Sequence, residues 1–373
     1  MKHKLILLVI VTALLGGCSS NDEKKNNDEL LTAPVISGDY AMLLPYEGND
    51  TRVAHANFNP SSYNIDEIGF GMLELSKKHF SPDDYVVKEG NLLSYDDLVP
   101  STSMDDQLGL LGRISDTNTI GLNPAKNSEL QLATGTNGKI ENPTIIVDIF
   151  EADMMKKEKD KYELNGVSIA MVVNDKLQVD DGLYGKTVQM DKAKFDLYVE
   201  ESARKLVSYL KNMPQVGDTV PIYVTIYNSS STDETLPGSF IAEAYFDSNN
   251  AKFTQIDEKW YLFPSKDVEK IDNVTYTQFV TLKNAISQSL PENVSVIGKG
   301  KYISNILDKL NITVTLQGKT YNEQIATIQY LKKLLTDFSD TNAEYTIDVK
   351  VVNDTVALLQ KPKGSKEVIV IEK

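Results

Sequence analysis

The single cysteine of this 373-residue chain, Cys18, limits how the chain can be stabilised. It follows a basic start, Lys2-His3-Lys4, and a run of eleven mostly apolar residues, Leu5–Leu15. At about 1.5 Å per residue this run reaches only about 16 Å, well short of the roughly 30 Å hydrocarbon core of a bilayer. The segment is therefore predicted to be an export signal. Because no second cysteine is available for a disulfide, the exported part must depend on ordinary apolar cores.

The residues before Cys18 predict that this cysteine carries a lipid. Leu15-Gly16-Gly17-Cys18 fits the bacterial lipoprotein pattern of apolar, small, small, Cys, with cleavage between Gly17 and Cys18. Acyl chains such as palmitate contribute about 0.8 kcal/mol per buried CH₂ group, enough to make attachment effectively permanent when several are present. We expect lipoprotein-processing enzymes to remove the signal peptide, residues 1–17, and the lipid at Cys18 to hold the chain on the outer face of the cell membrane. A buried or reactive thiol is the alternative.

The charge of the chain excludes one class of partner. The precursor has a formal charge of -15, and loss of Lys2 and Lys4 with the signal leaves 36 basic against 53 acidic residues, or -17. Such a surface repels nucleic acid and anionic lipid headgroups. We therefore expect no nucleic-acid binding, and membrane attachment through the lipid alone.

A polar segment separates the anchor from the folded chain. Residues 18–33 carry the cysteine and a charged stretch without a period that buries a face, which predicts a disordered tether. A boundary near Asp180-Asp181-Gly182 then gives an N-terminal α+β domain over residues 34–185 and a C-terminal α+β domain over 186–373, in line with the chain length.

Apolar spacing along the chain predicts the fold class. Helices are expected from Asn64 to the Ser81-Pro82 pair and over 191–213, 277–290, 301–310 and 321–338. Strands are expected over 143–151, 166–173, 219–227, 311–316 and the last thirty residues, and residues 239–246 and 251–263 are expected to pair as a hairpin. Helices alternating with hairpins indicate an α+β fold, with antiparallel or mixed sheets and helices packed on one face.

The sequence contains few patterns of residues that are typical of catalytic sites. The histidines are His3, His55 and His79, and the last 294 residues contain none. Ser202 and Lys205 have the Ser-x-x-Lys spacing of penicillin-recognising enzymes, but they lie well inside a predicted helix and no Lys-Thr-Gly or Ser-Asp-Asn motif accompanies them. We expect a non-catalytic protein without cofactor or metal ion, and an envelope hydrolase is the least favoured alternative.

The sole tryptophan marks the first place to look for a ligand groove. Trp260 lies in a predicted strand with Tyr261 and Phe263 beside it. A core position is the favoured interpretation of Trp260. If the chain has a binding groove, these three residues are the candidates for its lining.

Several segments in order carry a resemblance to a known family. They are the lipobox, the charged tether, the helix NIDEIGFGMLELSKKHF (64–80), IGLNPA (120–125), TVPIYVTIYN (219–228) and EKWYLFPS (258–265). Together they resemble the CamS family of Gram-positive sex-pheromone lipoproteins, over essentially the whole chain.

The resemblance implies that the end of the signal peptide is itself a product. In that family it is trimmed and released as a short hydrophobic peptide, which plasmid-bearing cells sense through a receptor before conjugative transfer. Ending directly before Cys18, the peptide here would be Val11, Thr12, Ala13, Leu14, Leu15, Gly16 and Gly17. The alternative is a solute-binding or envelope-interaction lipoprotein without a pheromone role, since such proteins share the anchor and the tether.

Overall fold

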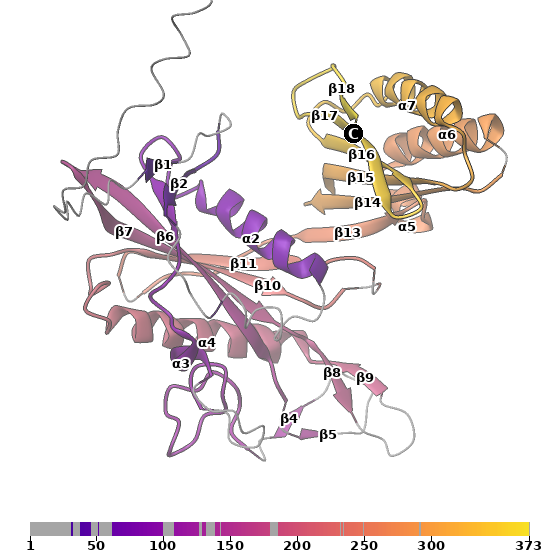
Figure 1. The fold of residues 1–373 in the computed structure, drawn as a ribbon. Helices are drawn as coiled ribbons and strands as arrows, with labels where there is room; N and C mark the ends of the chain where they lie inside the picture. The colour runs from indigo at the N-terminus through magenta and orange to yellow at the C-terminus, as the bar shows by residue number, and fades with distance from the viewer. Residues whose placement is uncertain are drawn as a thin grey trace, which may run out of the picture.

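The computed structural model describes residues 31–32, 38–45, 51, 62–99, 108–126, 129–131, 139–141, 143–179, 186–231, 233, 235–248, 250–290 and 292–372. These residues form two bodies, each built on one mixed β-sheet (Figure 1). The signal peptide, Cys18, the tether up to Leu30 and His55 lie outside the described residues.

The first sheet has eight strands in the order β1-β2-β3-β6-β7-β10-β11-β12. Their bounds are β1 Leu31–Thr32, β2 Ala41–Leu44, β3 Val86–Glu89, β6 Ile146–Glu158, β7 Lys161–Val173, β10 Ile222–Asn228, β11 Ser239–Phe246 and β12 Thr254–Gln255. Most neighbours are antiparallel, but β2 runs parallel to β3 and β7 parallel to β10. The β6–β7 pair forms a long hairpin that contains the strands expected over 143–151 and 166–173, with its turn at Lys159 and Asp160.

Helices cover both faces of the first sheet. Helix α2 (Ser62–Ser76) packs on one face and helix α4 (Lys192–Lys211) on the other, each with an apolar stripe toward the strands. Asp191 begins α4 by accepting a hydrogen bond from the Lys194 N–H at 3.1 Å. The short helix α3 (Tyr95–Leu98) and two small hairpins lie at the margin, β4 (Glu129–Gln131) with β5 (Lys139–Glu141) and β8 (Lys176–Val179) with β9 (Lys186–Gln189).

The second sheet contains strands β13 to β18 in chain order. Their bounds are β13 Glu258–Phe263, β14 Val294–Ile303, β15 Ile306–Leu316, β16 Glu344–Val351, β17 Asp354–Lys361 and β18 Ile369–Glu372. Helix α7 (Tyr321–Thr336) connects the parallel strands β15 and β16, and it packs with α5 (Lys266–Ile271) and α6 (Asn273–Ser289) into one core. The predicted α+β class with mixed sheets is therefore confirmed. Helices pack on one face of the second sheet, as expected, but the first sheet has helices on both faces.

The helix expected over 301–310 is wrong. These residues are the end of β14 and the start of β15, joined by a tight turn at Ser304 and Asn305. Both turn residues have positive φ, 52° and 65°, which is the backbone of the two-residue turns that match the twist of paired strands.

The hairpin expected over 239–246 and 251–263 forms only in part. Thr254 and Gln255 pair with β11, and the chain then leaves the first sheet, so that Glu258–Phe263 becomes β13 of the second sheet. The division between the sheets thus falls between Gln255, the end of β12, and Glu258, the start of β13. The predicted domain boundary at 185/186 does not coincide with it, because α4 and strands β10 to β12 complete the first sheet and its core.

Candidate functional site: the junction of the two sheets

Two adjacent residues tie the chain to different sheets at the junction. The Ile256 N–H donates to the Ile241 carbonyl of β11 at 2.8 Å, which holds Ile256 on the first sheet. The Asp257 carbonyl accepts from the Ser304 N–H at 2.7 Å, which holds Asp257 on the second. The passage from one body to the other along the chain is therefore one peptide unit long.

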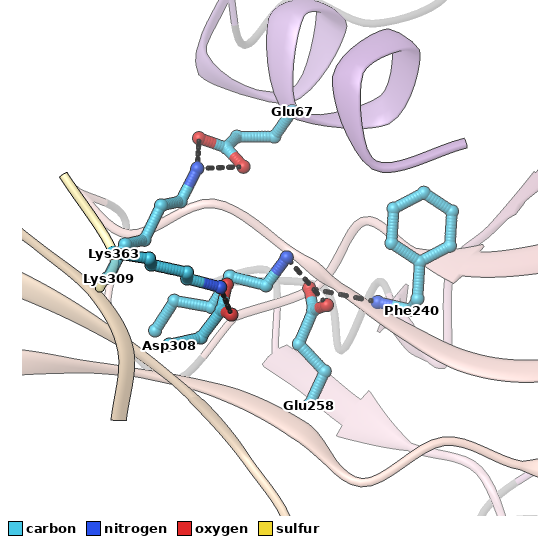
Figure 2. A network of polar contacts seen from close by, with 7 residues as sticks. Glu67, Phe240, Glu258, Asp308, Lys309 and Lys363 are labelled. Carbon is cyan, nitrogen blue, oxygen red and sulfur yellow. Dashed lines mark hydrogen bonds and ion pairs between the residues drawn. The ribbon is translucent and has the colours of Figure 1, made fainter. Parts of the chain in front are cut away.

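A lysine of the second sheet reaches into the first body. Lys309 Nζ in β15 donates to both carboxylate oxygens of Glu67 in α2, at 2.8 and 2.9 Å (Figure 2). The same nitrogen lies 5.1 Å from the ring centroids of both Phe70 and Trp260. A cation within about 6 Å of an aromatic face is attracted by the ring quadrupole. Glu67, Phe70 and Trp260 thus form a cage for one ammonium group, which we call the cation cage.

A second ion pair lies deeper in the junction. Glu258 of β13 pairs with Lys301 of β14 at 2.9 Å, and the two side chains are only 5% and 8% exposed. Glu258 also accepts from the Phe240 N–H of β11 at 3.3 Å, a bond across the sheets (Figure 2). Burial raises the pKa of the Glu258 carboxyl, although Lys301 opposes the shift. Lys299 adds a further contact by donating to the Thr235 carbonyl.

Apolar packing stays within each body. In the part of the chain that the structure describes, most buried apolar side chains form three clusters, and none of these clusters contains residues of both sheets. Trp260, buried at the junction, belongs to none of them. The contacts just described, which are polar and aromatic, join the bodies. Interfaces of this kind permit relative motion of the parts they join.

The three candidate groove residues all lie on strand β13, but they do not line a common groove. Trp260 is 6% exposed and faces the junction, beneath Lys309. Tyr261 and Phe263 point to the opposite face, where Tyr261 packs edge-on against Tyr302 and Phe263 against Phe279. Alternation along the strand separates them. Sequence reasoning singled out Trp260 but missed Glu67, Phe70 and Lys309.

The residues considered for catalysis have other roles in the structure. The Ser202 hydroxyl is buried and donates to the Leu122 carbonyl at 3.3 Å, while Lys205 on the same helix is exposed. His79 stacks on the Tyr245 ring with centroids 4.2 Å apart, and burial lowers its pKa. Ser202 and Lys205 therefore do not form a nucleophile and base pair.

A half-buried acid and a buried one, neighbours on strand β6, were not anticipated from the sequence. Glu151 in β6 accepts from the N–H groups of Leu92 and Leu93, at 2.9 and 2.8 Å, and so fixes the loop after β3. Asp153, two residues further on, is 3% exposed. Burial raises the pKa of both carboxyls, that of Asp153 to about 9 with help from the neighbouring Glu151 charge. The pair therefore holds a proton at neutral pH.

A hollow of about 330 Å³ opens between α2 and the strands β2, β3 and β6. Its lining is largely apolar and includes Met42, Met72, Leu73, Val87, Phe150 and Ala152, together with the charged residues Lys88, Glu89 and Glu151. Among the described residues there is no group of three or more His, Cys, Asp or Glu placed to hold a metal ion. None of the helices in the described part of the chain is long and apolar enough to cross a membrane.

Comparison with solved structures relates the whole architecture to known proteins. A sex pheromone precursor from Lactobacillus salivarius subsp. salivarius UCC118, solved at 1.35 Å, superposes with a TM-score of 0.79 at 23% identity, over 92% of this chain and 98% of that chain. The C-terminal domain of the sex pheromone staph-cAM373 precursor from Staphylococcus aureus gives a TM-score of 0.66 at 22% identity, over 85% of this chain and 98% of that chain. These likenesses establish a shared fold.

Sequence comparison identifies the family. No curated protein matches the chain. The family described as CamS sex pheromone cAM373 precursor matches residues 46–367, which include both sheets' main strands and the whole junction. This is a family of pheromone precursors and not a known enzyme family. The chain belongs to the CamS family of sex pheromone precursors.

Proposed function

We propose that this protein is a lipid-anchored surface lipoprotein whose signal peptide ends in a released pheromone. Lipoprotein-processing enzymes cleave between Gly17 and Cys18, and the lipid on Cys18 holds the chain on the outer face of the membrane. The segment Val11–Gly17 is then trimmed and released, and a receptor on plasmid-bearing cells senses it. The folded body has a separate role without catalysis.

The observation that carries this proposal is the family match over residues 46–367. A family of pheromone precursors implies a secreted or surface protein. The sequence adds the steps that the match does not cover, because Leu15-Gly16-Gly17-Cys18 has the lipobox pattern directly after an apolar run too short to span a bilayer.

Peptide mass spectrometry of the culture medium tests the release step. Wild type is compared with Cys18→Ala, which removes the thiol that the lipid requires, and with Ser19→Ala, which leaves the lipobox intact. We expect the peptide VTALLGG, or a form trimmed by a residue, in the medium of wild type and Ser19→Ala only. Synthetic VTALLGG added to plasmid-bearing cells then raises the frequency of conjugation.

Two results would refute parts of the proposal separately. If Cys18 is acylated on the cell but no fragment of residues 11–17 leaves it, the pheromone role fails and the anchor stands. If metabolic labelling with palmitate gives no signal that depends on Cys18, the anchor fails as well.

A second candidate function is the binding of a small apolar solute in the hollow beside α2. The hollow has the volume of small-molecule sites, which begin at about 300 Å³, and an apolar lining. A solute at 100 times its dissociation constant adds about 2.7 kcal/mol to the free energy of unfolding, so a metabolite panel should raise Tm. Ala152→Leu, which narrows the hollow, should abolish that rise, and a panel without any rise refutes this candidate.

A further inference from the structure

We propose that Lys309 and the cation cage form a latch that holds the two sheets in their closed arrangement, and that the cage is a binding site for an alkylammonium group. In the structure the ammonium group of Lys309 occupies this site. The proposal concerns the folded body and does not depend on the pheromone role.

The cage is assembled from both bodies. Glu67 and Phe70 stand three residues apart on α2, and side chains at this spacing lie on one face of a helix. Trp260 and Lys309 come from β13 and β15, and both pair with Lys301 of the intervening strand, so they lie in one row across the second sheet. Neither body alone surrounds the ammonium group.

The chemistry of the cage selects a cation of this class. A carboxylate with two oxygens within 2.9 Å of Nζ supplies the charge, and two rings at 5.1 Å supply further attraction without hydrogen bonds. The Lys309 and Glu67 side chains are 14% and 21% exposed, so the site is shielded from water yet reachable at its rim. Phe70, 55% exposed, forms that rim.

The surroundings allow the latch to open. Ile256 and Asp257 are hydrogen-bonded to different sheets, so a hinge at the peptide between them moves one body against the other. Among the described residues no buried apolar cluster bridges the bodies, and the closed arrangement therefore depends on the polar and aromatic contacts of the junction.

Distances between spin labels test the latch. The full chain is kept in detergent with Cys18→Ser, and labels are placed at Lys205→Cys in α4 and Lys332→Cys in α7, both exposed positions on different bodies. We expect one narrow distance distribution with Lys309 present and a distribution at least twice as wide with Lys309→Ala. Lys309→Arg should stay narrow, since a guanidinium also pairs with a carboxylate and stacks on rings.

A neighbouring lysine provides the matched control. Lys363 forms an ion pair with Asp308, the residue before Lys309, but both partners belong to the second sheet (Figure 2). Lys363→Ala should therefore keep the narrow distribution. If Lys309→Ala leaves the distribution unchanged, or Lys363→Ala widens it equally, the latch is refuted.

Chemical rescue tests the cage as a binding site. n-Propylammonium is the group that Lys309→Ala deletes beyond Cβ, and n-propanol has nearly the same shape without the charge. We expect n-propylammonium to return the Lys309→Ala distribution to the wild-type width, and to fail when Trp260→Leu is added. No narrowing, or equal narrowing by n-propanol, overturns the assignment of the cage as a cation site.

Discussion

Gly69 and Gly71 stand two residues apart in α2 and should respond oppositely to alanine. A Cβ added at Gly69 meets nothing within 4 Å, whereas one added at Gly71 lies 2.3 Å from a carbon of the Phe240 ring. Because glycine weakens a helix interior, Gly69→Ala should raise the free energy of unfolding by about 0.5–1 kcal/mol. Gly71→Ala should lower it by about 1–3 kcal/mol through overpacking. Urea unfolding followed by far-UV circular dichroism measures both, and a neutral Gly71→Ala would mean that the Phe240 ring yields without cost.

Asp153 should make the protein less stable as the pH rises. The folded chain holds the Asp153 proton up to a pKa of about 9, while the unfolded chain loses it near 4, so the folded state binds more protons between these values. Stability contributed by this group is therefore lost as pH rises through that window. Asn at this position keeps the shape and can both donate and accept hydrogen bonds. Each pH unit within the window is worth about 1.4 kcal/mol, so the stability of Asp153→Asn relative to wild type should rise by up to about 4 kcal/mol between pH 5 and pH 8.

Urea unfolding at pH 5, 6.5 and 8 measures that gain. Asp160→Asn, at the exposed turn of the β6–β7 hairpin, is the matched control and should run parallel to wild type. An Asp153→Asn curve that also runs parallel to wild type would show that Asp153 is ionised in the folded protein.

At the scale of the element, local signals decided which predictions were confirmed. Helix α4, expected over 191–213, begins after the cap at Asp191, and α7, expected over 321–338, begins after Thr320 with a capping box from Glu323. Such signals are complete within a few residues of sequence. The region 301–310 lacks them, and the spacing of Leu307 and Leu310 fits a helix as well as the bulged strand that forms. Its conformation is set by pairing with β13 and β16, which no local pattern encodes.

Substitutions at the two turn residues between β14 and β15 should therefore change the stability of the protein strongly. Ser304 and Asn305 both have positive φ, which glycine and asparagine adopt readily and β-branched residues do not. Ser304→Val should destabilise by about 1–2 kcal/mol, and Asn305→Gly should be neutral or stabilising. Thermal unfolding of both variants tests this, and tolerance of valine at 304 would mean that the hairpin can form another turn.

At the scale of the molecule, the sequence predicts the fold class but not the junction between the two sheets. Alternating apolar residues in the strands and apolar stripes on the helices are enough to indicate two α+β units. The contact between Glu67 and Lys309 joins residues 242 apart in the sequence, and no local pattern links the two. The chain also changes sheets inside a stretch, 251–263, whose pattern is that of continuous strand. Where a strand pairs is a property of the assembled sheet, so this position could not be inferred from the sequence.

The separation of the apolar clusters predicts that the second body folds by itself. The side chains of its core all lie between Tyr261 and Val370, so a fragment of residues 257–373 should keep its far-UV circular dichroism and unfold cooperatively. The sole tryptophan, Trp260, lies at the junction and is 6% exposed in the whole chain. Without α2 above it, the fluorescence emission of Trp260 should shift to longer wavelength in the folded fragment.

Lys309→Ala in the full chain should shift the Trp260 emission in the same direction by a smaller amount, and Lys363→Ala, the control, should leave it unshifted. A fragment that is unfolded in buffer would mean that the second core needs the first sheet, because the polar junction would then contribute stability that the core itself lacks.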